Sequence, residues 1–227
     1  MSNLKGVGVA LVTPFNEDLS VDFDSLTRLV EYNIENGTNY LVVLGTTAEA
    51  ATLSAAEKQE VIKHVIKINN KRLPLVLGIG GNNTLEVKKQ IEEADLTDFD
   101  AVLSVSPYYN KPNQEGLYQH YKMLASTGKQ IIIYNVPGRT GQNIEASTTL
   151  RLANEFPNLF MIKEAAPNIL QYFDILRKKP ANFSLVSGDD EYTLPVTLAG
   201  GDGVISVIGQ GYPKEFSTMV QLAFEGK

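Results

Sequence analysis

The chain contains no cysteine, and this absence excludes disulfide bonds, a thiolate nucleophile and a thiolate metal site. Histidine is scarce as well: His64 and His120 lie far apart in the sequence, and neither belongs to an H-E-x-x-H pattern. Metal chemistry is therefore not indicated, although a site built from carboxylates alone stays open.

Long apolar runs and blocks of like charge are also missing. No apolar run reaches the length of a membrane span. The opening segment "MSNLKGVGVALVTPF" reads as a strand rather than a signal peptide, because no polar cleavage region follows a sustained apolar core. The net charge is −6 and no Lys/Arg-rich block stands out, which argues against a nucleic-acid binder. We expect a cytoplasmic protein that binds neither membranes nor nucleic acid.

What is present is enough apolar sequence for one substantial core. The 227 residues are 43% hydrophobic and 20% charged, which does not suggest disorder. No linker, low-complexity tract or shift in composition divides the chain. We therefore expect residues 1–227 to form a single domain.

Short apolar runs alternate with amphipathic segments along the whole chain. The predicted strands are 6–15, 40–47, 74–81, 101–109, 131–138, 160–165, 184–190 and 203–210. The predicted helices are 22–36, 54–69, 84–96, 114–126, 146–156, 169–178, 191–199 and 213–224. The apolar runs are continuous and do not alternate with polar residues, as in strands buried on both faces. Eight such units predict an α/β fold, a parallel (β/α)8 TIM barrel.

An open doubly wound sheet is the alternative fold. Against it, no G-x-G-x-x-G opens a helix after the first predicted strand. "GIGGNN" at 78–83 follows the third strand and lacks the third glycine, so it indicates a tight strand-to-helix turn.

Lys163 stands in an apolar run, "NLFMIKEAAP", where a lysine is unexpected. An edge strand would let its head reach water. A closed barrel has no edge strand, so the amine must point into the barrel or towards the helices, and either place lowers its pKa by desolvation. A nearby Arg139 cation would act in the same direction. A neutral amine is the form that attacks a carbonyl.

Several motifs at the predicted strand ends point together to one family. They are "GTTAEA", "SPYYNKPNQEG", "YNVPGRTG", "IKEA", "SGDD" and "GGDGVISV". In this order they resemble the pyruvate-dependent class I aldolases of the dihydrodipicolinate synthase / N-acetylneuraminate lyase family. The resemblance implies an enzyme without a cofactor, in which Lys163 forms a Schiff base with pyruvate. The resulting enamine would attack L-aspartate 4-semialdehyde and give 4-hydroxy-tetrahydrodipicolinate, in lysine and diaminopimelate biosynthesis.

The resemblance also implies roles for three hydroxyl residues near the Schiff base. Tyr134 would relay protons, supported by Thr46 and Tyr109. In the family, the tyrosine at the position of Tyr109 reaches across a dimer interface. We therefore expect a homodimer or tetramer.

By the same resemblance, four further residues would bind substrates. The Thr47 hydroxyl and adjacent backbone N–H groups would hold the pyruvate carboxylate, and Gly188 and Ile205 would line the site through backbone carbonyls. Arg139 would bind the carboxylate of the semialdehyde, since its fork of donors suits a planar anion.

Two alternative functions stay open. One is another pyruvate-dependent aldolase or lyase of the N-acetylneuraminate lyase type, and the other is a barrel that binds such ligands without turnover. The sialic-acid lyases lack an arginine at the position of Arg139, so "NVPGRTG" favours the synthase.

Other polar residues near the motifs have simpler explanations. Glu164 should face the helices, since neighbours on a strand point to opposite faces. Asp189 and Asp190 are expected to cap the helix that follows them. Tyr108 is either aromatic packing at a strand end or a ligand-binding residue. His64 and His120 are expected to be surface or packing residues on helices.

The sequence also departs from the family pattern in places. Asn82, Glu86 and Tyr108 match the lysine-binding positions of inhibited members, but Lys58 would repel a lysine ligand. Ala48 replaces a glycine, which would strain the backbone if φ were positive there. Family members continue past the eighth helix, so we expect a barrel without that C-terminal helical segment.

Overall fold

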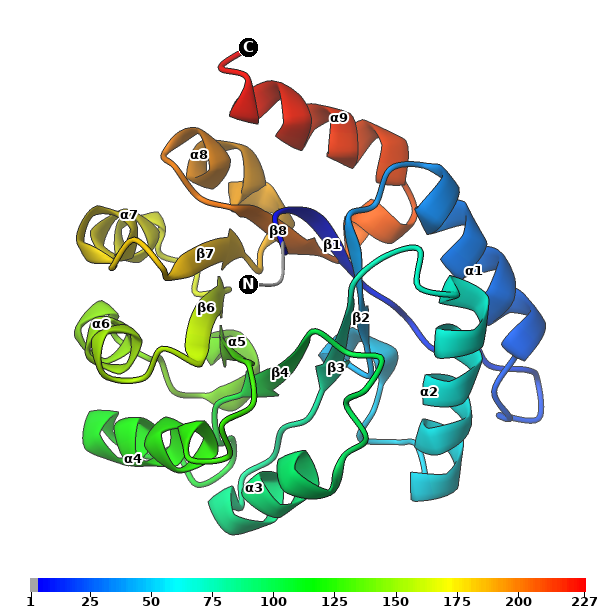
Figure 1. Cartoon of the computed structure of the whole chain (residues 1–227), viewed down its shortest axis with the longest axis horizontal. Coiled ribbons are helices and arrows are strands. Elements are labelled where there is room, and N and C mark those ends of the chain that lie inside the picture. The colour runs from blue at the N-terminus through cyan, green and yellow to red at the C-terminus, as the bar shows by residue number, and fades with distance from the viewer. Residues whose placement is uncertain (1–3) are drawn as a thin grey trace.

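The computed structural model describes residues 4–227 as a closed barrel of eight parallel strands in chain order, ringed by helices (Figure 1). The strands are β1 Gly6–Ala10, β2 Tyr40–Val43, β3 Leu75–Gly78, β4 Ala101–Val105, β5 Ile131–Asn135, β6 Leu159–Glu164, β7 Ser184–Ser187 and β8 Gly203–Ser206. The barrel closes where β1 pairs with β8, from Gly6 opposite Gly203 to Val9 opposite Ser206. The predicted TIM barrel is confirmed, and the open sheet is excluded.

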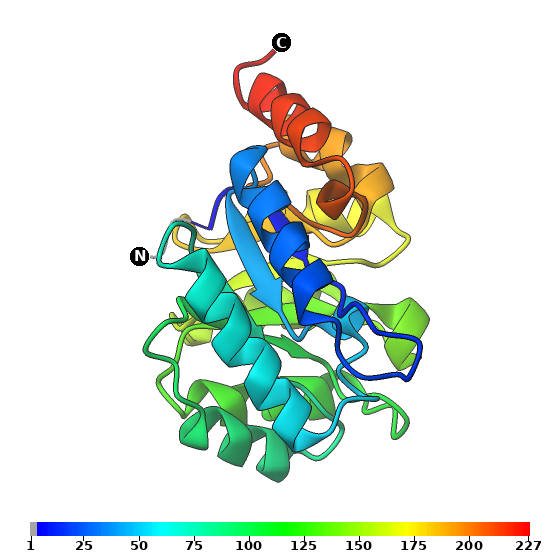
Figure 2. The ribbon, with the colours of Figure 1, turned by 90° about the vertical axis from the view of Figure 1, so that its right-hand side faces the viewer.

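Helices follow the strands and cover the outside of the barrel. They are α1 Phe23–Glu35, α2 Ala55–Asn69, α3 Thr84–Glu93, α4 Gln114–Ala125, α5 Pro137–Thr140, α6 Ala146–Glu155, α7 Ile169–Lys178, α8 Thr193–Leu198 and α9 Pro213–Phe224. Three 3-10 helices, η1 Thr46–Ala48, η2 Asp190–Tyr192 and η3 Ile208–Gln210, lie after β2, β7 and β8. Figure 2 shows α1 and α2 side by side on the outer surface.

Local sequence signals explain where several helices begin. The Asp22 side chain accepts a hydrogen bond from the Ser25 N–H and so caps α1. Ser54 and Glu57 form a capping box at the start of α2, each side chain accepting from the other's backbone N–H. The first strand is shorter than predicted. It ends at Ala10, and the chain then loops so that Phe15 pairs with Val21 in an antiparallel bridge.

The core has an inner and an outer layer. Side chains such as Val42, Leu103 and Ile132 fill the barrel interior, while two larger apolar clusters lie between the strands and the helices. The ring of Tyr40 occupies the space beside Gly8, where a Cβ would lie 2.1 Å from ring carbon Cε2. Only glycine allows β1 and this aromatic ring to share the interior.

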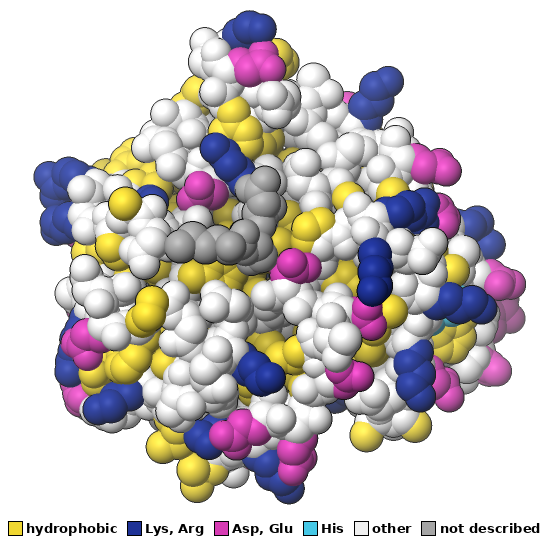
Figure 3. Space-filling model, in the orientation of Figure 1, with side chains coloured by type: hydrophobic (Ala, Val, Ile, Leu, Met, Phe, Trp, Pro, Cys, Tyr) yellow, Lys and Arg dark blue, Asp and Glu magenta, His cyan; other side chains and the backbone are white. Residues whose placement is uncertain are grey.

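The surface carries mixed charge. Figure 3 shows Lys/Arg and Asp/Glu side chains interspersed over one face of the molecule. Among residues 4–227, no helix is long and apolar enough to cross a lipid bilayer.

Candidate active site

Tyr134 and Lys163 lie side by side near the carboxyl ends of two adjacent strands. They are register partners on β5 and β6, and the Lys163 Nζ atom is 4.5 Å from the centroid of the Tyr134 ring. Both side chains are buried, with Lys163 only 3% exposed. Strand alternation places Lys163 on the same face as Met161, which belongs to the inner apolar layer. Of the two directions open to the amine, the structure shows the barrel interior.

Burial lowers the pKa of the Lys163 amine. Desolvation is the main cause, and the nearby Arg139 cation adds to it. Tyr134 and Asp190 act in the opposite direction. The expected direction of the shift is confirmed, and the arrangement favours a neutral amine beside a tyrosine hydroxyl.

Gly188 makes room for the lysine side chain. A Cβ atom built at this position would lie 2.9 Å from both Cγ and Cε of Lys163, and 2.8 Å from the Ala165 Cβ. The Gly188 N–H also donates to the Glu164 carbonyl oxygen at 2.6 Å. Ile205 is fully buried in the inner layer. The predicted roles of the Gly188 and Ile205 carbonyls stay predictions.

The segment after β2 brings two threonines to the barrel mouth. Thr46 and Thr47 begin the 3-10 helix η1, and the Thr46 Oγ1 atom lies 3.5 Å from the Tyr134 hydroxyl. Thr13, which the motif analysis missed, is buried and donates from its hydroxyl to the Ala48 carbonyl at 2.8 Å. This bond anchors η1 to the segment after β1.

Ala48 stands where the family pattern has glycine, but its backbone is not strained, because its φ angle is not positive. Left-handed φ angles in this segment belong to Leu44 (57°) and Glu49 (53°) instead. The 3-10 helix that contains Thr46 and Thr47 therefore forms without a left-handed backbone at position 48.

Arg139 lies in the short helix α5, which follows β5. Its side chain is exposed, and it is close enough to Lys163 to influence the amine electrostatically. Among the ion pairs of residues 4–227, none joins Arg139 to Glu145. None of these ion pairs involves Arg139 at all, so within the described residues its guanidinium stays available to an anion from solvent.

Tyr109 does not join the buried pair within one chain. It is 87% exposed and adopts a left-handed φ of 73°. Tyr108 is 41% exposed, so its ring is only partly packed within one chain. The Asn110 amide donates to the Asn82 carbonyl at 3.1 Å and brings the two loops together. Glu86, at the start of α3, accepts a hydrogen bond from Gln90 of the same helix.

Comparison with known proteins agrees with this geometry. A model of the dihydrodipicolinate synthetase family matches residues 3–227. The chain belongs to that family. The 4-hydroxy-tetrahydrodipicolinate synthase of Flavobacterium psychrophilum is 59% identical over 98% of this chain and 76% of its own length.

Solved structures of the family have the same fold. The chloride-inhibited dihydrodipicolinate synthase of Acinetobacter baumannii, in complex with pyruvate, has a TM-score of 0.93 at 44% identity, over 98% of this chain and 76% of that one. A monomeric dihydrodipicolinate synthase variant has a TM-score of 0.94 at 40% identity, over 99% of this chain and 76% of that one.

One of the two expected cap residues in this family member has a different role. Asp189 accepts a hydrogen bond from the Glu191 N–H, as predicted. The prediction for Asp190 is wrong: its carboxylate accepts from the Ser206 hydroxyl and from the N–H groups of Val207 and Ile208. Asp190 therefore joins the end of β7 to the segment after β8, a contact that local sequence does not indicate.

The two histidines are packing residues on helices, as expected. His64 Nε2 lies 2.7 Å from the Thr27 hydroxyl, between α1 and α2. His120 is buried with Nδ1 2.8 Å from the Thr84 hydroxyl, and burial lowers its pKa to about 4.

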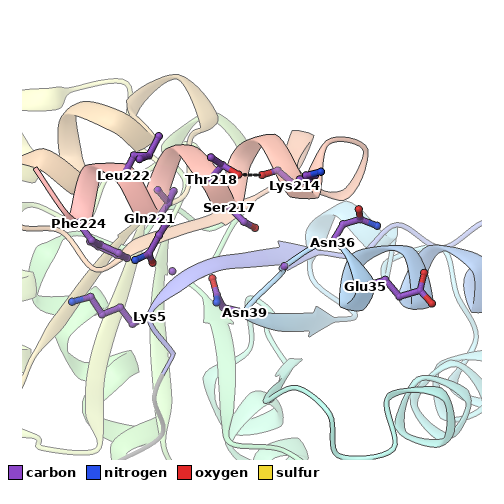
Figure 4. Close-up of a pocket in the computed structure, with 13 residues that line it drawn as sticks. Lys5, Glu35, Asn36, Asn39, Lys214, Ser217, Thr218, Gln221, Leu222 and Phe224 are labelled. Atoms are coloured by element: carbon purple, nitrogen blue, oxygen red, sulfur yellow. Dashed lines mark hydrogen bonds between the residues drawn. The ribbon is translucent and has the colours of Figure 1, made fainter. Parts of the chain in front are cut away.

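Figure 4 shows a hollow of about 910 Å³ between α9 and the amino-terminal ends of β1 and β2. Lys163 lies near the carboxyl end of β6, so the hollow is at the other end of the barrel. Its walls include the start of β1 at Lys5 and Gly6, Asn39 just before β2, and helix α9. The Lys5 Nζ atom lies 4.5 Å from the centroid of the Phe224 ring. Since TIM-barrel chemistry occurs at the carboxyl ends of the strands, this hollow is not the candidate active site.

Proposed function

We propose that this protein is a Schiff-base-forming synthase that condenses pyruvate with L-aspartate 4-semialdehyde to 4-hydroxy-tetrahydrodipicolinate, in lysine and diaminopimelate biosynthesis. The observation that carries the proposal is the buried Lys163 amine beside Tyr134, with its pKa lowered by desolvation. The name of the Flavobacterium psychrophilum relative and the pyruvate complex of the Acinetobacter baumannii enzyme support it.

The chemistry begins at the Lys163 amine. Its nitrogen adds to the ketone carbon of pyruvate and gives a carbinolamine. Transfer of a proton to the carbinolamine hydroxyl then expels water and leaves the protonated imine. Loss of a methyl proton then gives the enamine, whose carbon forms a bond to the aldehyde carbon of the second substrate. The amino group of the adduct finally attacks the imine carbon, closes the ring and releases Lys163 as the free amine.

Tyr134 and Thr46 are placed to move the protons in these steps. The Tyr134 ring lies against the lysine amine, and its hydroxyl lies 3.5 Å from Thr46 Oγ1. A hydroxyl at this point can donate to the departing water and accept the proton back later. We assign Tyr134 the proton relay and Thr46 its support.

Two groups at the barrel mouth suit the substrate carboxylates. The first N–H groups of a helix have no acceptor within it, so those of Thr46 and Thr47, with the Thr47 hydroxyl, suit the pyruvate carboxylate. The exposed Arg139 guanidinium suits the carboxylate of the semialdehyde through two parallel hydrogen bonds. The Gly188 and Ile205 carbonyls would line the same space.

Tyr109 would complete the site of a second copy of the chain. Its exposure and left-handed backbone support this role, because strained backbone conformations of this kind cluster at functional sites. The assembly would then be a homodimer or a larger oligomer. Asn82, Glu86 and Tyr108 would form an inhibitor site at the same interface. The cytoplasmic location expected from the sequence stays a prediction.

Borohydride reduction in the presence of pyruvate tests the central step. We expect peptide mass mapping to place one reduced pyruvyl adduct on Lys163, and Lys163→Arg to abolish it. Lys179→Arg is the matched control, since Lys179 is also partly buried and donates to the Phe183 carbonyl. An adduct that persists in Lys163→Arg would contradict the assignment.

The second substrate separates the synthase from the two alternatives. Product with aspartate 4-semialdehyde supports the synthase. Cleavage of a sialic acid instead would support the lyase. Trapping of pyruvate without turnover of either would leave a ligand-binding barrel.

A further inference from the structure

A buried carboxylate that the proposed chemistry does not use lies directly behind the reactive lysine. Glu164 is the last residue of β6, is fully buried, and faces away from the barrel interior. Its Oε1 atom accepts hydrogen bonds from Asn135 Nδ2 and the Ala166 N–H, both at 2.8 Å. Its Oε2 atom accepts from Gln171 Nε2 at 2.8 Å and from Asn135 Nδ2 at 3.1 Å. The prediction that Glu164 faces the helices is confirmed. Its carboxylate is also the centre of a buried hydrogen-bond network.

The strand register places this carboxylate behind the reactive pair. Tyr134 is opposite Lys163, and the next pair in the register is Asn135 opposite Glu164. Successive residues of a strand point to opposite faces. The two reactive side chains on the inner face are therefore followed by two hydrogen-bonded side chains on the outer face of the same strands.

The direction of the main hydrogen bond is determined by the backbone. The Ile144 N–H donates to Asn135 Oδ1 at 2.9 Å, so Nδ2 must be the atom that faces Glu164. Asn143 extends the network: its Oδ1 accepts from Asn135 and its Nδ2 donates to Gln171. The network thus joins β5, β6, α7 and the segment before α6.

The backbone of Glu164 is held as tightly as its side chain. The Tyr172 hydroxyl and the Gly188 N–H both donate to its carbonyl oxygen at 2.6 Å. Gly188 is the residue against which the Lys163 side chain lies. The placement of Glu164 and that of the reactive lysine are therefore linked through both strands that flank β6.

No cation neutralises Glu164 among the hydrogen bonds and ion pairs of the described residues. The titratable groups near enough to feel the charge of Glu164 are Tyr121 of α4 and Tyr172 of α7, and burial raises the pKa of both, so they stay neutral. Burial raises the pKa of Glu164 to about 7, against the hydrogen bonds from Asn135, Gln171 and the Ala166 N–H. Each of these groups donates, so only the ionised carboxylate can accept from all of them.

We propose that Glu164, in its ionised form, is a positioning residue that holds the ends of β5 and β6 so that the Tyr134 hydroxyl and the Lys163 amine keep their relative placement. Glu164 acts through the outer face of the sheet and does not touch substrate. The inference rests on the proposed Schiff-base role of Lys163.

Glu164→Gln tests the proposal, because it places an amide donor against donors while keeping the size of the side chain. We expect the rate of pyruvate adduct formation and kcat to fall about 10- to 100-fold, the loss typical of a small misplacement of reacting groups. The KM for pyruvate should stay within about threefold, since the groups that bind its carboxylate are untouched. Glu155→Gln is the control: Glu155 also accepts a hydrogen bond, from the Tyr118 hydroxyl at 2.6 Å, but lies on the exposed helix layer.

The pH profile distinguishes positioning from a purely structural role. Activity of the parent should fall as pH drops through the pKa of Glu164, about 7, because the protonated carboxyl brings a donor to donors. Glu164→Gln should lack this acidic limb. Gln171→Met removes a hydrogen bond that lowers the Glu164 pKa, so it should move the limb to higher pH. If Glu164→Gln does not fold, the pH profile of Gln171→Met tests the proposal in its place.

Other outcomes would overturn the proposal. One is a Glu164→Gln protein whose kcat stays within twofold of the parent. Another is a Glu164→Gln protein whose kcat falls only in proportion to its folded fraction, while its pH profile stays that of the parent. A parent that traps no pyruvate would overturn the proposed function and this inference with it. A parent that traps pyruvate but makes no product would overturn only the second substrate, and Glu164 would then be judged on the trapping rate and its pH dependence.

Discussion

At the scale of single residues, the site depends on how closely side chains approach Lys163. The amine is buried beside an aromatic ring, and its aliphatic stem fills the space that Gly188 leaves. The lowered pKa follows from the same burial, because water is excluded from around the charged form. The same few contacts therefore determine both the position of the Lys163 side chain and the pKa of its amine.

Gly188→Ala should disturb this arrangement directly. The added Cβ would lie 2.9 Å from two carbons of the lysine stem, so the amine must move, and overpacking of this kind costs about 1–3 kcal/mol. We expect pyruvate trapping to slow about 10-fold or more. Gly138→Ala is the control, because nothing lies within 4 Å of its added Cβ. Equal trapping rates in the two variants would contradict the role assigned to Gly188.

At the scale of elements, contacts between segments hold the polar strand ends in place. The Thr13 hydroxyl anchors η1, and the Asp190 carboxylate binds the segment after β8. Both contacts satisfy backbone groups that the turns leave without partners. The polar strand ends are thus positioned by side chains from neighbouring units of the barrel.

Thr13→Val removes the hydroxyl that anchors η1 and keeps the shape of the side chain. We expect a loss of about 1–3 kcal/mol in the free energy of unfolding, because the buried Ala48 carbonyl loses its donor. The KM for pyruvate should rise, since Thr46 and Thr47 belong to η1. Thr149→Val is the control, because the buried Thr149 hydroxyl has no hydrogen-bond partner, and its removal should be neutral or stabilising. Urea unfolding and pyruvate saturation curves measure both effects, and similar behaviour of the two variants would refute the anchoring role.

At the scale of the whole molecule, a closed barrel collects residues from distant parts of the sequence at one end. Thr46, Tyr134, Arg139 and Lys163 come from three separate βα units and lie at the same mouth. Tyr109 alone of the proposed catalytic residues points away from its own chain. Its exposure fits the proposed interaction between chains, and that role, like the treatment of residues 1–227 as one domain, stays a prediction.

Mixing two inactive variants tests whether Tyr109 acts across an interface. Lys163→Arg lacks the amine, and Tyr109→Ala lacks the outward tyrosine. In a mixed dimer, the Tyr109→Ala chain keeps Lys163 and receives Tyr109 from its partner, so random exchange of equal amounts should restore about a quarter of the parent activity. Absence of any restoration, with mixed dimers verified by mass, would show that Tyr109 does not act in this way.

The sequence by itself determined the barrel and the helix caps at Asp22 and Ser54, and the resemblance of its motifs to a family indicated the residues that are proposed to carry the chemistry. These follow from local patterns: strand and helix periods, cap residues next to the helices that they begin, and short motifs at strand ends. Only the tertiary structure decided that Lys163 points inwards, that Asp190 binds the segment after β8, and that Glu164 joins two strands from behind. The physical reason is that strands buried on both faces carry no signal of which face is inner. Contacts between separate βα units exist only once the strands have paired in register.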